Sequence, residues 1–216
     1  MSAREDILNT VRRRLNRRQS LEASLQAALE ARLRDSRPGP QPEWSEEVVA
    51  RFVAKSEAVH CSVAFVDKMS SVPQAVEEYL AEQQLPRELV AAPHPLLTGL
   101  DWLPETAISW QWAEGRDSVG LSVAYAGIAE TGTVALLSSE SSPASINFLP
   151  SAHIIVLQGE RILRQQEDLW VLLRSESMPM PRALNLVTGP SKTGDVEQTI
   201  VYGAHGPSQV HLLIAD

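Results

Sequence analysis

Apolar residues in the first 36 positions recur at the spacing of an amphipathic helix. The repeating positions are Ile7, Leu8, Val11, Leu15, Leu21, Leu25, Ala28, Leu29 and Leu33, with a break near Gln19-Ser20. Three prolines follow between Ser36 and Pro42, and proline is incompatible with a helix interior. The pattern predicts an N-terminal helical arm over residues 1–36 and a separate domain over residues 43–216.

Beyond the proline-rich linker, apolar runs of strand length alternate with stretches of helical periodicity. Helices are predicted at 44–59, 72–84 and 161–174, and strands at 61–66, 87–92, 101–112, 153–157, 183–187 and 210–214, with two further strand-like runs on either side of residues 130–133. Alternation of this kind is typical of a sheet whose strands are joined by crossover helices. The predicted fold class is therefore α/β, with a mainly parallel sheet flanked by helices.

The charge is distributed unevenly along the chain. Residues 4–34 hold eight arginines and four acidic residues, whereas the whole chain has a net charge of −8. A basic helix can bind nucleic acid, but the acidic remainder would repel a polyanion, and no aromatic residue interleaves the arginines. We expect no nucleic-acid partner. The arm is interpreted as a solvated helix face, or as an arm that docks on an acidic surface of another copy of the chain or of a partner protein.

Composition restricts the chemistry further. No apolar run has the length of a membrane span, and the charged start Met1 to Asp6 does not resemble a signal peptide, so a cytoplasmic protein is expected. The single cysteine, Cys61, excludes an internal disulfide and any iron–sulfur or zinc site built on cysteines of this chain. Cys61 heads an apolar run and is interpreted as a buried structural thiol. The five histidines do not show HExxH spacing, so neither a cofactor nor a metal is expected, although a metal site assembled only by the fold stays open.

The stretch Thr188 to Glu197 is the strongest candidate for binding chemistry. The predicted strand 183–187 enters a loop of Gly, Ser, Lys and Thr, and helical spacing follows from Asp195 to Val201. The first amide groups of a helix are unpaired and lie at the positive end of its dipole, so the loop Ser191-Lys192-Thr193 is suited to a small organic anion. The alternative is ordinary helix capping by Thr193 or Asp195. The glycine spacing of a phosphate-binding P-loop and of a dinucleotide fold is missing.

A second candidate is the tetrad Glu130-Thr131-Gly132-Thr133, which lies at a strand junction. A carboxylate beside two hydroxyl groups can act as a nucleophile, as a base or as a clamp on a polar ligand. The alternative is a solvated turn in which the threonines only favour strand structure.

Four segments together resemble the lactate-utilisation protein C family, whose members carry a LUD domain. They are Ile128 to Thr133, Leu149-Pro150-Ser151-Ala152-His153-Ile154, Thr188 to Glu197, and Gly203-Ala204-His205-Gly206-Pro207. They stand in the family's order and span most of the chain from about Glu43 onward. One departure is Lys192, where the family more often has Arg, and a point charge is a less specific carboxylate ligand than a bidentate guanidinium. Another is Gly194-Asp195-Val196, where Ala-Asp-Ile is usual.

The resemblance implies a fold like that of the superfamily of glucosamine-phosphate deaminase, ribose-phosphate isomerase and CoA-transferase. It also implies a role in bacterial oxidation of L-lactate to pyruvate, beside a cysteine-rich protein and an iron–sulfur protein. The site residues that it implies are Glu130, Thr131, Gly132, Thr133, Ser191, Lys192, Thr193, Asp195, His205 and Gly206. Loops at the carboxyl ends of parallel strands converge, so three of the motifs are expected around one crevice.

Two classes of function follow. In the first, the chain is an accessory or ligand-binding subunit that holds a small organic anion. In the second, it is an acyl-transfer enzyme in which Glu130 is the nucleophile and His205 moves a proton. The first is favoured, because the threonines beside Glu130 resemble hydrogen-bonding partners for a polar ligand and the sequence places no second base nearby.

Overall fold

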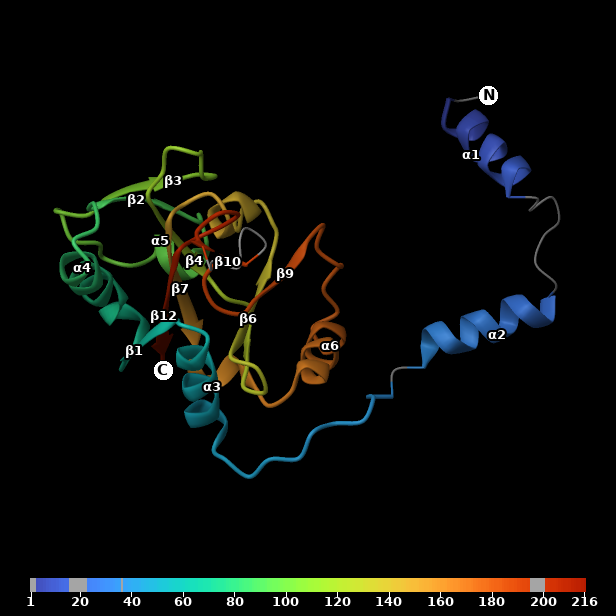
Figure 1. Ribbon diagram of the computed structural model, residues 1–216, viewed down its shortest axis with the longest axis horizontal. Helices are drawn as coiled ribbons and strands as arrows, with labels where there is room; N and C mark the ends of the chain where they lie inside the picture. Colours follow the sequence, from blue (N-terminus) through green and yellow to red (C-terminus); the bar gives the residue numbers. More distant parts are fainter. Residues whose placement is uncertain (1–2, 16–22, 36, 195–200) are drawn as a thin grey trace. The chain divides into compact units, whose positions relative to one another are not determined.

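The computed structural model describes residues 3–15, 23–35, 37–194 and 201–216. The chain divides into two compact units, Met1–Gln41 and Pro42–Asp216. Each unit has its own secondary structure (Figure 1).

The first unit is helical in the part that is described. It contains α1 (Ala3–Arg14) and α2 (Ala23–Arg34), and neither helix has a buried residue. Apolar side chains such as Ile7 and Leu29 are exposed along the helices. Within the described ranges of the chain, no helix combines the length and the apolar character needed to cross a membrane.

The second unit is built on a six-stranded parallel sheet with the order β1-β12-β7-β4-β2-β3. The strands are β1 (Ser62–Val66), β2 (Glu88–Ala91), β3 (Ala107–Trp110), β4 (Val119–Val123), β7 (Ala152–Gln158) and β12 (Gln209–Ala215). Every pairing in it is parallel, so the predicted fold class is confirmed. The central strands β7 and β12 are covered on both faces, which explains their continuous apolar sequences.

Helices α4 and α5 cover one face of this sheet. The regular helices of the unit are α3 (Val48–Ala58), α4 (Val72–Glu82), α5 (Pro95–Thr98) and α6 (Gln166–Ser175), and the short 3-10 helices are η1 (Met69–Ser71), η2 (Ala144–Asn147) and η3 (Gly159–Arg161). Val76 and Leu80 of α4 and Leu97 of α5 belong to one core cluster with Ile154 and Leu213 of the sheet. Figure 1 shows α4 and α6 on opposite sides of the strands.

A second sheet and α3 cover the other face. This sheet has the order β8-β5-β6-β9 and consists of β5 (Ala126–Ile128), β6 (Thr133–Leu137), β8 (Ile162–Leu163) and β9 (Leu184–Val187). Phe52 of α3 and Leu136 of β6 share a core cluster with Ile155 and Leu212 of the parallel sheet. The sequence does not predict this separate sheet, in which β5 and β9 both pair antiparallel with β6. The helix predicted at 161–174 starts later, at Gln166, because residues 162–163 join the sheet as β8.

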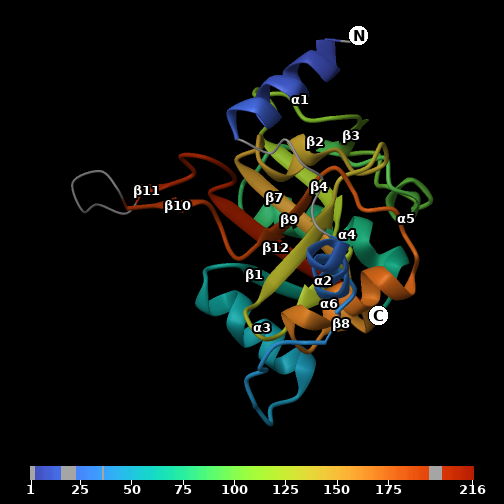
Figure 2. The ribbon, with the colours of Figure 1, turned by 90° about the vertical axis from the view of Figure 1, so that its right-hand side faces the viewer.

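A small hairpin replaces the expected start of a helix after Ser191. Strand β10 (Lys192–Thr193) pairs antiparallel with β11 (Val201–Tyr202). Figure 2 shows the pair projecting from the rest of its unit. Val201, the last residue of the helix predicted at 195–201, is therefore in a strand, and residues 195–200 lie outside the described residues. The prediction of a helix that begins directly after Thr193 has no support in the described part.

Candidate functional site

The loop after β9 and the loop before β12 are joined through Ser191. The Ser191 amide donates to the Pro207 carbonyl oxygen (2.7 Å), and the Ser191 carbonyl oxygen accepts from the Gly203 amide (3.0 Å). The Ser191 hydroxyl oxygen accepts from the His205 amide (3.3 Å). A β-carbon added to Gly206 would lie 3.4 Å from the Ser191 β-carbon, so the two loops approach closely. Three of the predicted site residues, Ser191, His205 and Gly206, thus lie together.

These loops border a cavity of about 240 Å³. Its lining comes from η2 and the residue after it, β7, the end of β9, the start of β12 and both loops. The lining residues are Asn147, Phe148, His153, Leu186, Val187, Thr188, Gly189, Ser191, His205, Gly206, Pro207 and Val210. The volume lies just below the range usual for drug-sized ligands and is suited to a small molecule.

Two buried polar atoms in this lining have no hydrogen-bond partner within the described structure. They are Oδ1 of Asn147 and Nδ1 of His153. Asn147 is 3% exposed and His153 is 1% exposed. Buried polar atoms are normally paired, and an unpaired one costs about 1–3 kcal/mol. Both residues line the cavity, so a bound molecule is one candidate partner for these two atoms.

His153 is neutral at neutral pH. Its burial lowers the pKa of the imidazole to about 3, because the charged form loses its hydration. The other ring nitrogen, Nε2, lies 2.8 Å from the Ser122 hydroxyl oxygen on β4. If Ser122 donates to Nε2, the proton is on Nδ1 and the cavity receives a donor. If Nε2 donates to Ser122, the cavity receives an acceptor. The direction of the Ser122 hydrogen bond therefore decides whether Nδ1 of His153 is a donor or an acceptor.

The sequence predicts unpaired amide groups at Ser191-Lys192-Thr193, at the start of a helix. The described part of the structure has no helix start there. The Ser191 amide is already bonded to Pro207, and Lys192 and Thr193 are paired with Tyr202 and Val201 in the β10–β11 hairpin. The Lys192 ammonium group lies 5.9 Å from the centre of the Tyr202 ring. Neither Lys192 nor Thr193 lines the cavity. Asp195, also predicted for this site, lies outside the described residues.

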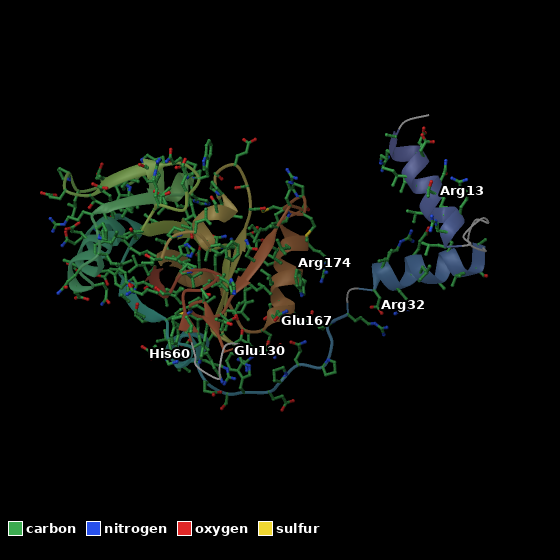
Figure 3. All side chains as sticks on the ribbon, turned by 45° about the horizontal axis from the view of Figure 1, so that its top comes forward. Arg13, Arg32, His60, Glu130, Glu167 and Arg174 are labelled. Carbon is green, nitrogen blue, oxygen red and sulfur yellow. The ribbon has the colours of Figure 1, made fainter. Side chains whose placement is uncertain are left out.

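Glu130 lies apart from this cavity. It is in the turn between β5 and β6, and its Oε2 accepts a hydrogen bond from the amide of Gln166 (3.1 Å), the first residue of α6. A carboxylate at this position pairs one of the open amides of the helix and interacts favourably with its dipole. In Figure 3, Glu130 lies near Glu167, at the same end of α6. Glu130 is therefore held by α6 and is not among the residues that line the cavity.

Thr131 and Thr133 form a chain of hydroxyl groups that ends at the cavity. The hydroxyl oxygens of Thr131 and Thr133 are 2.7 Å apart, and those of Thr133 and Thr188 are 2.6 Å apart. Thr188 lines the cavity, whereas Thr131 and Thr133 do not. The threonines thus tie the turn after β5 to the end of β9.

Gly132 and Gly189 allow both turns to approach α3. Each has a positive φ, +70° and +82° respectively, which glycine adopts without strain. A β-carbon on Gly132 would lie 2.4 Å from the Ser56 amide nitrogen, and one on Gly189 would lie 2.4 Å from the Val59 carbonyl oxygen. These two glycines of the motifs therefore have a packing role against α3.

The cavity lies at the amino ends of the parallel strands. His153 is the second residue of β7, and Val210 is the second residue of β12. The expectation that the motifs meet at the carboxyl ends of the strands was wrong. Its premise fails because β9, which carries the Thr188–Ser191 loop, belongs to the second sheet and runs antiparallel to β6.

Sequence reasoning did not include Asn147, His153 and Ser122 in the site. A signal existed for His153, because it stands in the segment Leu149 to Ile154 that carries part of the family resemblance. No sequence signal marks Asn147, which is in η2, or Ser122, which is inside an apolar strand.

Cys61 and the acidic residues offer no metal centre in the described part of the chain. No group of three or more His, Cys, Asp or Glu side chains is placed there to hold a metal ion. Cys61 is buried, as predicted, and its burial raises the pKa of the thiol to about 11. A thiol with this pKa is protonated at neutral pH and is a poor nucleophile.

Comparisons with known proteins agree with the motifs. Residues 116–215 match the LUD domain family. This part of the chain is therefore similar to the LUD domain. Every residue that lines the cavity lies inside the matched region, and so does Ser122.

Curated relatives extend this result. A match over 130 residues is 28% identical to lactate utilization protein C of Bacillus subtilis (strain 168) and covers 54% of each chain. A match over 122 residues is 32% identical to the uncharacterized protein YkgG of Escherichia coli (strain K12) and covers 51% of this chain and 53% of that one. The resemblance to the lactate-utilisation protein C family is confirmed, although the matches span only about half the length of these relatives.

A solved structure resembles the fold of this chain. It is a DUF162 family protein from Deinococcus radiodurans, with a TM-score of 0.57 and 16% sequence identity, and the match covers 80% of this chain and 99% of that chain. At this identity the likeness concerns the fold alone.

Proposed function

We propose that this protein is a ligand-binding, accessory subunit of a bacterial lactate-utilisation system. In this proposal a small organic acid such as lactate or pyruvate occupies the cavity lined by His153, Asn147, Ser191 and His205. The name of the Bacillus subtilis relative supports the physiological context. The cavity supports the binding role.

The observation that carries the proposal is the pair of unpartnered polar atoms, Asn147 Oδ1 and His153 Nδ1. Lactate has a hydroxyl group that donates and a carboxylate that accepts, so it can satisfy an acceptor and a donor at once. Pairing both atoms removes the cost that the free protein bears. His205, which lines the cavity, would be the partner of the lactate carboxylate.

The alternative, acyl transfer with Glu130 as nucleophile, has less support. The Glu130 carboxylate accepts from Gln166 at the start of α6 and is not part of the cavity lining. A nucleophile must reach the bound substrate, and a base must reach the nucleophile. The described geometry does not bring Glu130 and His205 to one cavity.

The partners are proposed from the resemblance. Oxidation of lactate to pyruvate releases two electrons, which need an acceptor. We propose that the cysteine-rich and iron–sulfur proteins of the system supply it, and that this subunit presents or retains the acid. The basic arm of α1 and α2 is proposed to dock on an acidic surface of a partner or of a second copy.

Calorimetric titration of the purified full-length protein with L-lactate, pyruvate and propionate tests the binding role. Propionate has the carboxylate but no second polar group, so it should bind more weakly by about 2- to 12-fold, the equivalent of one neutral hydrogen bond. Equal affinity for the three acids, or no binding of any, would contradict the proposal.

A pair of histidine variants tests the location. His205→Asn should weaken lactate binding, whereas His60→Asn should not, because His60 is exposed but does not line the cavity. Asparagine also tolerates the positive φ of His60, 70°, which keeps the control free of backbone strain. Equal effects of the two substitutions would remove the ligand from this cavity.

A further inference from the structure

A second cavity, of about 530 Å³, lies at the carboxyl ends of the parallel strands. His94, which follows β2, and Val123 to Tyr125, at the end of β4, contribute to its lining. Between β2 and β4 the order of strands reverses: β3 lies on the far side of β2, and β7 lies on the far side of β4. Ligands of open α/β sheets bind preferentially outside the carboxyl ends of the strands at such a switch point.

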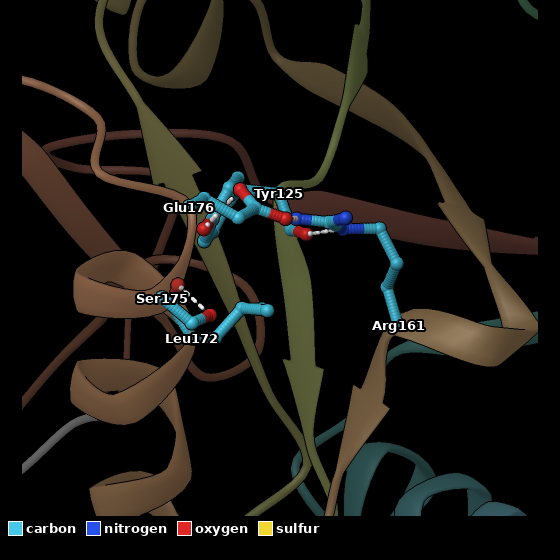
Figure 4. A network of polar contacts seen from close by, with 5 residues as sticks. All are labelled: Tyr125, Arg161, Leu172, Ser175 and Glu176. Atoms are coloured by element: carbon cyan, nitrogen blue, oxygen red, sulfur yellow. Dashed lines mark hydrogen bonds and ion pairs between the residues drawn. The ribbon is translucent and has the colours of Figure 1, made fainter.

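One wall of this cavity is the segment Met178-Pro179-Met180-Pro181, which joins α6 to β9. Glu176 anchors its start, because the Glu176 carboxylate accepts from the Tyr125 hydroxyl (2.7 Å) and pairs with Arg161 (3.0 Å). Arg161 also donates through Nε to the Tyr125 carbonyl oxygen (2.6 Å), as Figure 4 shows. The segment therefore has a fixed origin beside the cavity.

The other end of this segment is held by Ser138, the residue that follows β6. The Ala183 amide donates to the Ser138 hydroxyl oxygen (2.8 Å), and the Ser138 amide donates to the Ala183 carbonyl oxygen (2.9 Å). Two methionines and two prolines thus form an apolar wall that is fixed at both ends. Methionine is unbranched and adapts to the shape of an apolar ligand.

The polar groups of the same cavity are mainly donors. His94 has a pKa lowered by burial, so it is neutral at neutral pH. Its Nδ1 accepts from the Leu96 amide (3.2 Å), which places the proton on Nε2, and this donor has no partner in the described structure. Hydroxyl groups of Ser139, Ser141 and Ser142 also line the cavity.

Arg182 gives the cavity a positive charge. It lines the cavity and makes no hydrogen bond or ion pair with the described residues. No acidic side chain is among the lining residues, although the chain has a net charge of −8. A guanidinium that shares a cavity with neutral donors favours an anion, and carboxylates match its fork geometry.

We propose that this second cavity binds a monocarboxylate with an alkyl chain, with the carboxylate at Arg182 and His94 and the chain along the Met178–Pro181 wall. The site is separate from the cavity of Ser191 and His205 and needs no residue of it. The proposal therefore stands or falls independently of the lactate-binding role.

Titration of the full-length protein with hexanoate, 1-hexanol and acetate tests the assignment. Hexanoate should bind at least about tenfold more tightly than hexanol, which lacks the charge, and more tightly than acetate, which lacks the chain. Arg182→Gln should weaken hexanoate binding by at least about tenfold. The matched control Arg174→Gln, an exposed arginine of α6 outside the cavity, should leave it unchanged.

The proposal would be overturned by no hexanoate binding, by equal binding of hexanol or of acetate, or by equal effects of Arg182→Gln and Arg174→Gln. Competition with inorganic phosphate distinguishes a site for alkyl carboxylates from a general anion site. Displacement of hexanoate by phosphate at a similar concentration would contradict recognition of the alkyl chain. An Asn147→Leu variant separates the two cavities: it should not change hexanoate binding, even if lactate binding is lost.

Discussion

Replacing Asn147 by leucine should separate ligand binding from stability. Leucine has the same branched arrangement of side-chain heavy atoms as asparagine, with two larger methyl groups and no polar atom. In the free protein the Oδ1 atom of Asn147 is buried without a partner, which costs about 1–3 kcal/mol. Asn147→Leu removes that cost, so the free energy of unfolding should rise by up to about 1–3 kcal/mol. At the same time the variant loses the acceptor for the lactate hydroxyl, and affinity should fall by about 2- to 12-fold.

Asn185 provides a matched control. Its Nδ2 atom is also buried without a partner, but Asn185 is on β9 and does not line the cavity. Asn185→Leu should therefore also raise the free energy of unfolding, with unchanged lactate affinity. Urea unfolding followed by circular dichroism gives the stability of each variant, and calorimetric titration gives the affinity.

The reasoning is refuted if Asn147→Leu binds lactate as tightly as the unaltered protein. It is also refuted if Asn147→Leu and Asn185→Leu reduce affinity equally, since the effect would then not be local to the cavity. A fall in the free energy of unfolding of Asn147→Leu, with none in Asn185→Leu, would contradict the predicted gain in stability.

Four further predictions concern other parts of the molecule. Glu130→Gln should leave lactate affinity unchanged and lower the free energy of unfolding by no more than about 1 kcal/mol. In the unaltered protein, hydroxylamine should trap no acyl adduct, and an adduct on Glu130 would restore the acyl-transfer role. Gly132→Ala should lower the free energy of unfolding by more than about 1 kcal/mol, because φ is +70° and α3 occupies the space that a β-carbon would need. The control Gly115→Ala, where no atom lies within 4 Å of the added β-carbon, should be tolerated in the same urea assay. Burial holds the pKa of His153 at about 3, against an ordinary 6.5, so between these pH values the unfolded chain binds more protons than the folded one. The free energy of unfolding should therefore fall as the pH is lowered from 6.5 to 3. In His153→Gln it should fall less steeply over this range, and an unchanged slope would contradict the burial argument. Deleting residues 1–36 should weaken assembly, measured by analytical ultracentrifugation, in a salt-dependent way and leave lactate affinity intact; weaker lactate binding with unchanged assembly would refute the role of the arm.

Local patterns predicted the elements of the parallel sheet well. The runs at 61–66, 153–157 and 210–214 are mainly apolar, with one polar residue each, and the interior strands of a parallel sheet require mainly apolar sequences. They correspond to β1, β7 and β12. The second sheet was not predictable in this way, because its strands are short and its pairing of β6 with β9 joins residues about 50 positions apart.

The site was predictable in its motifs but not in its geometry. Ser191, His205 and Gly206 were identified from sequence and do lie together. The helix expected after Thr193 was inferred from spacing alone, and strand pairing of Lys192 with Tyr202 takes precedence over that local pattern. Glu130 has the residue type of a nucleophile, but only the fold reveals that its carboxylate pairs with the start of α6.

The central claim is that a small organic acid occupies the cavity at the amino ends of β7 and β12. A crystal structure of the full-length protein with L-lactate tests it most directly. We predict lactate within hydrogen-bonding distance of His153 Nδ1 and Asn147 Oδ1, with its carboxylate near His205. Lactate bound only elsewhere, with both buried atoms still unpaired at a saturating concentration, would contradict the claim.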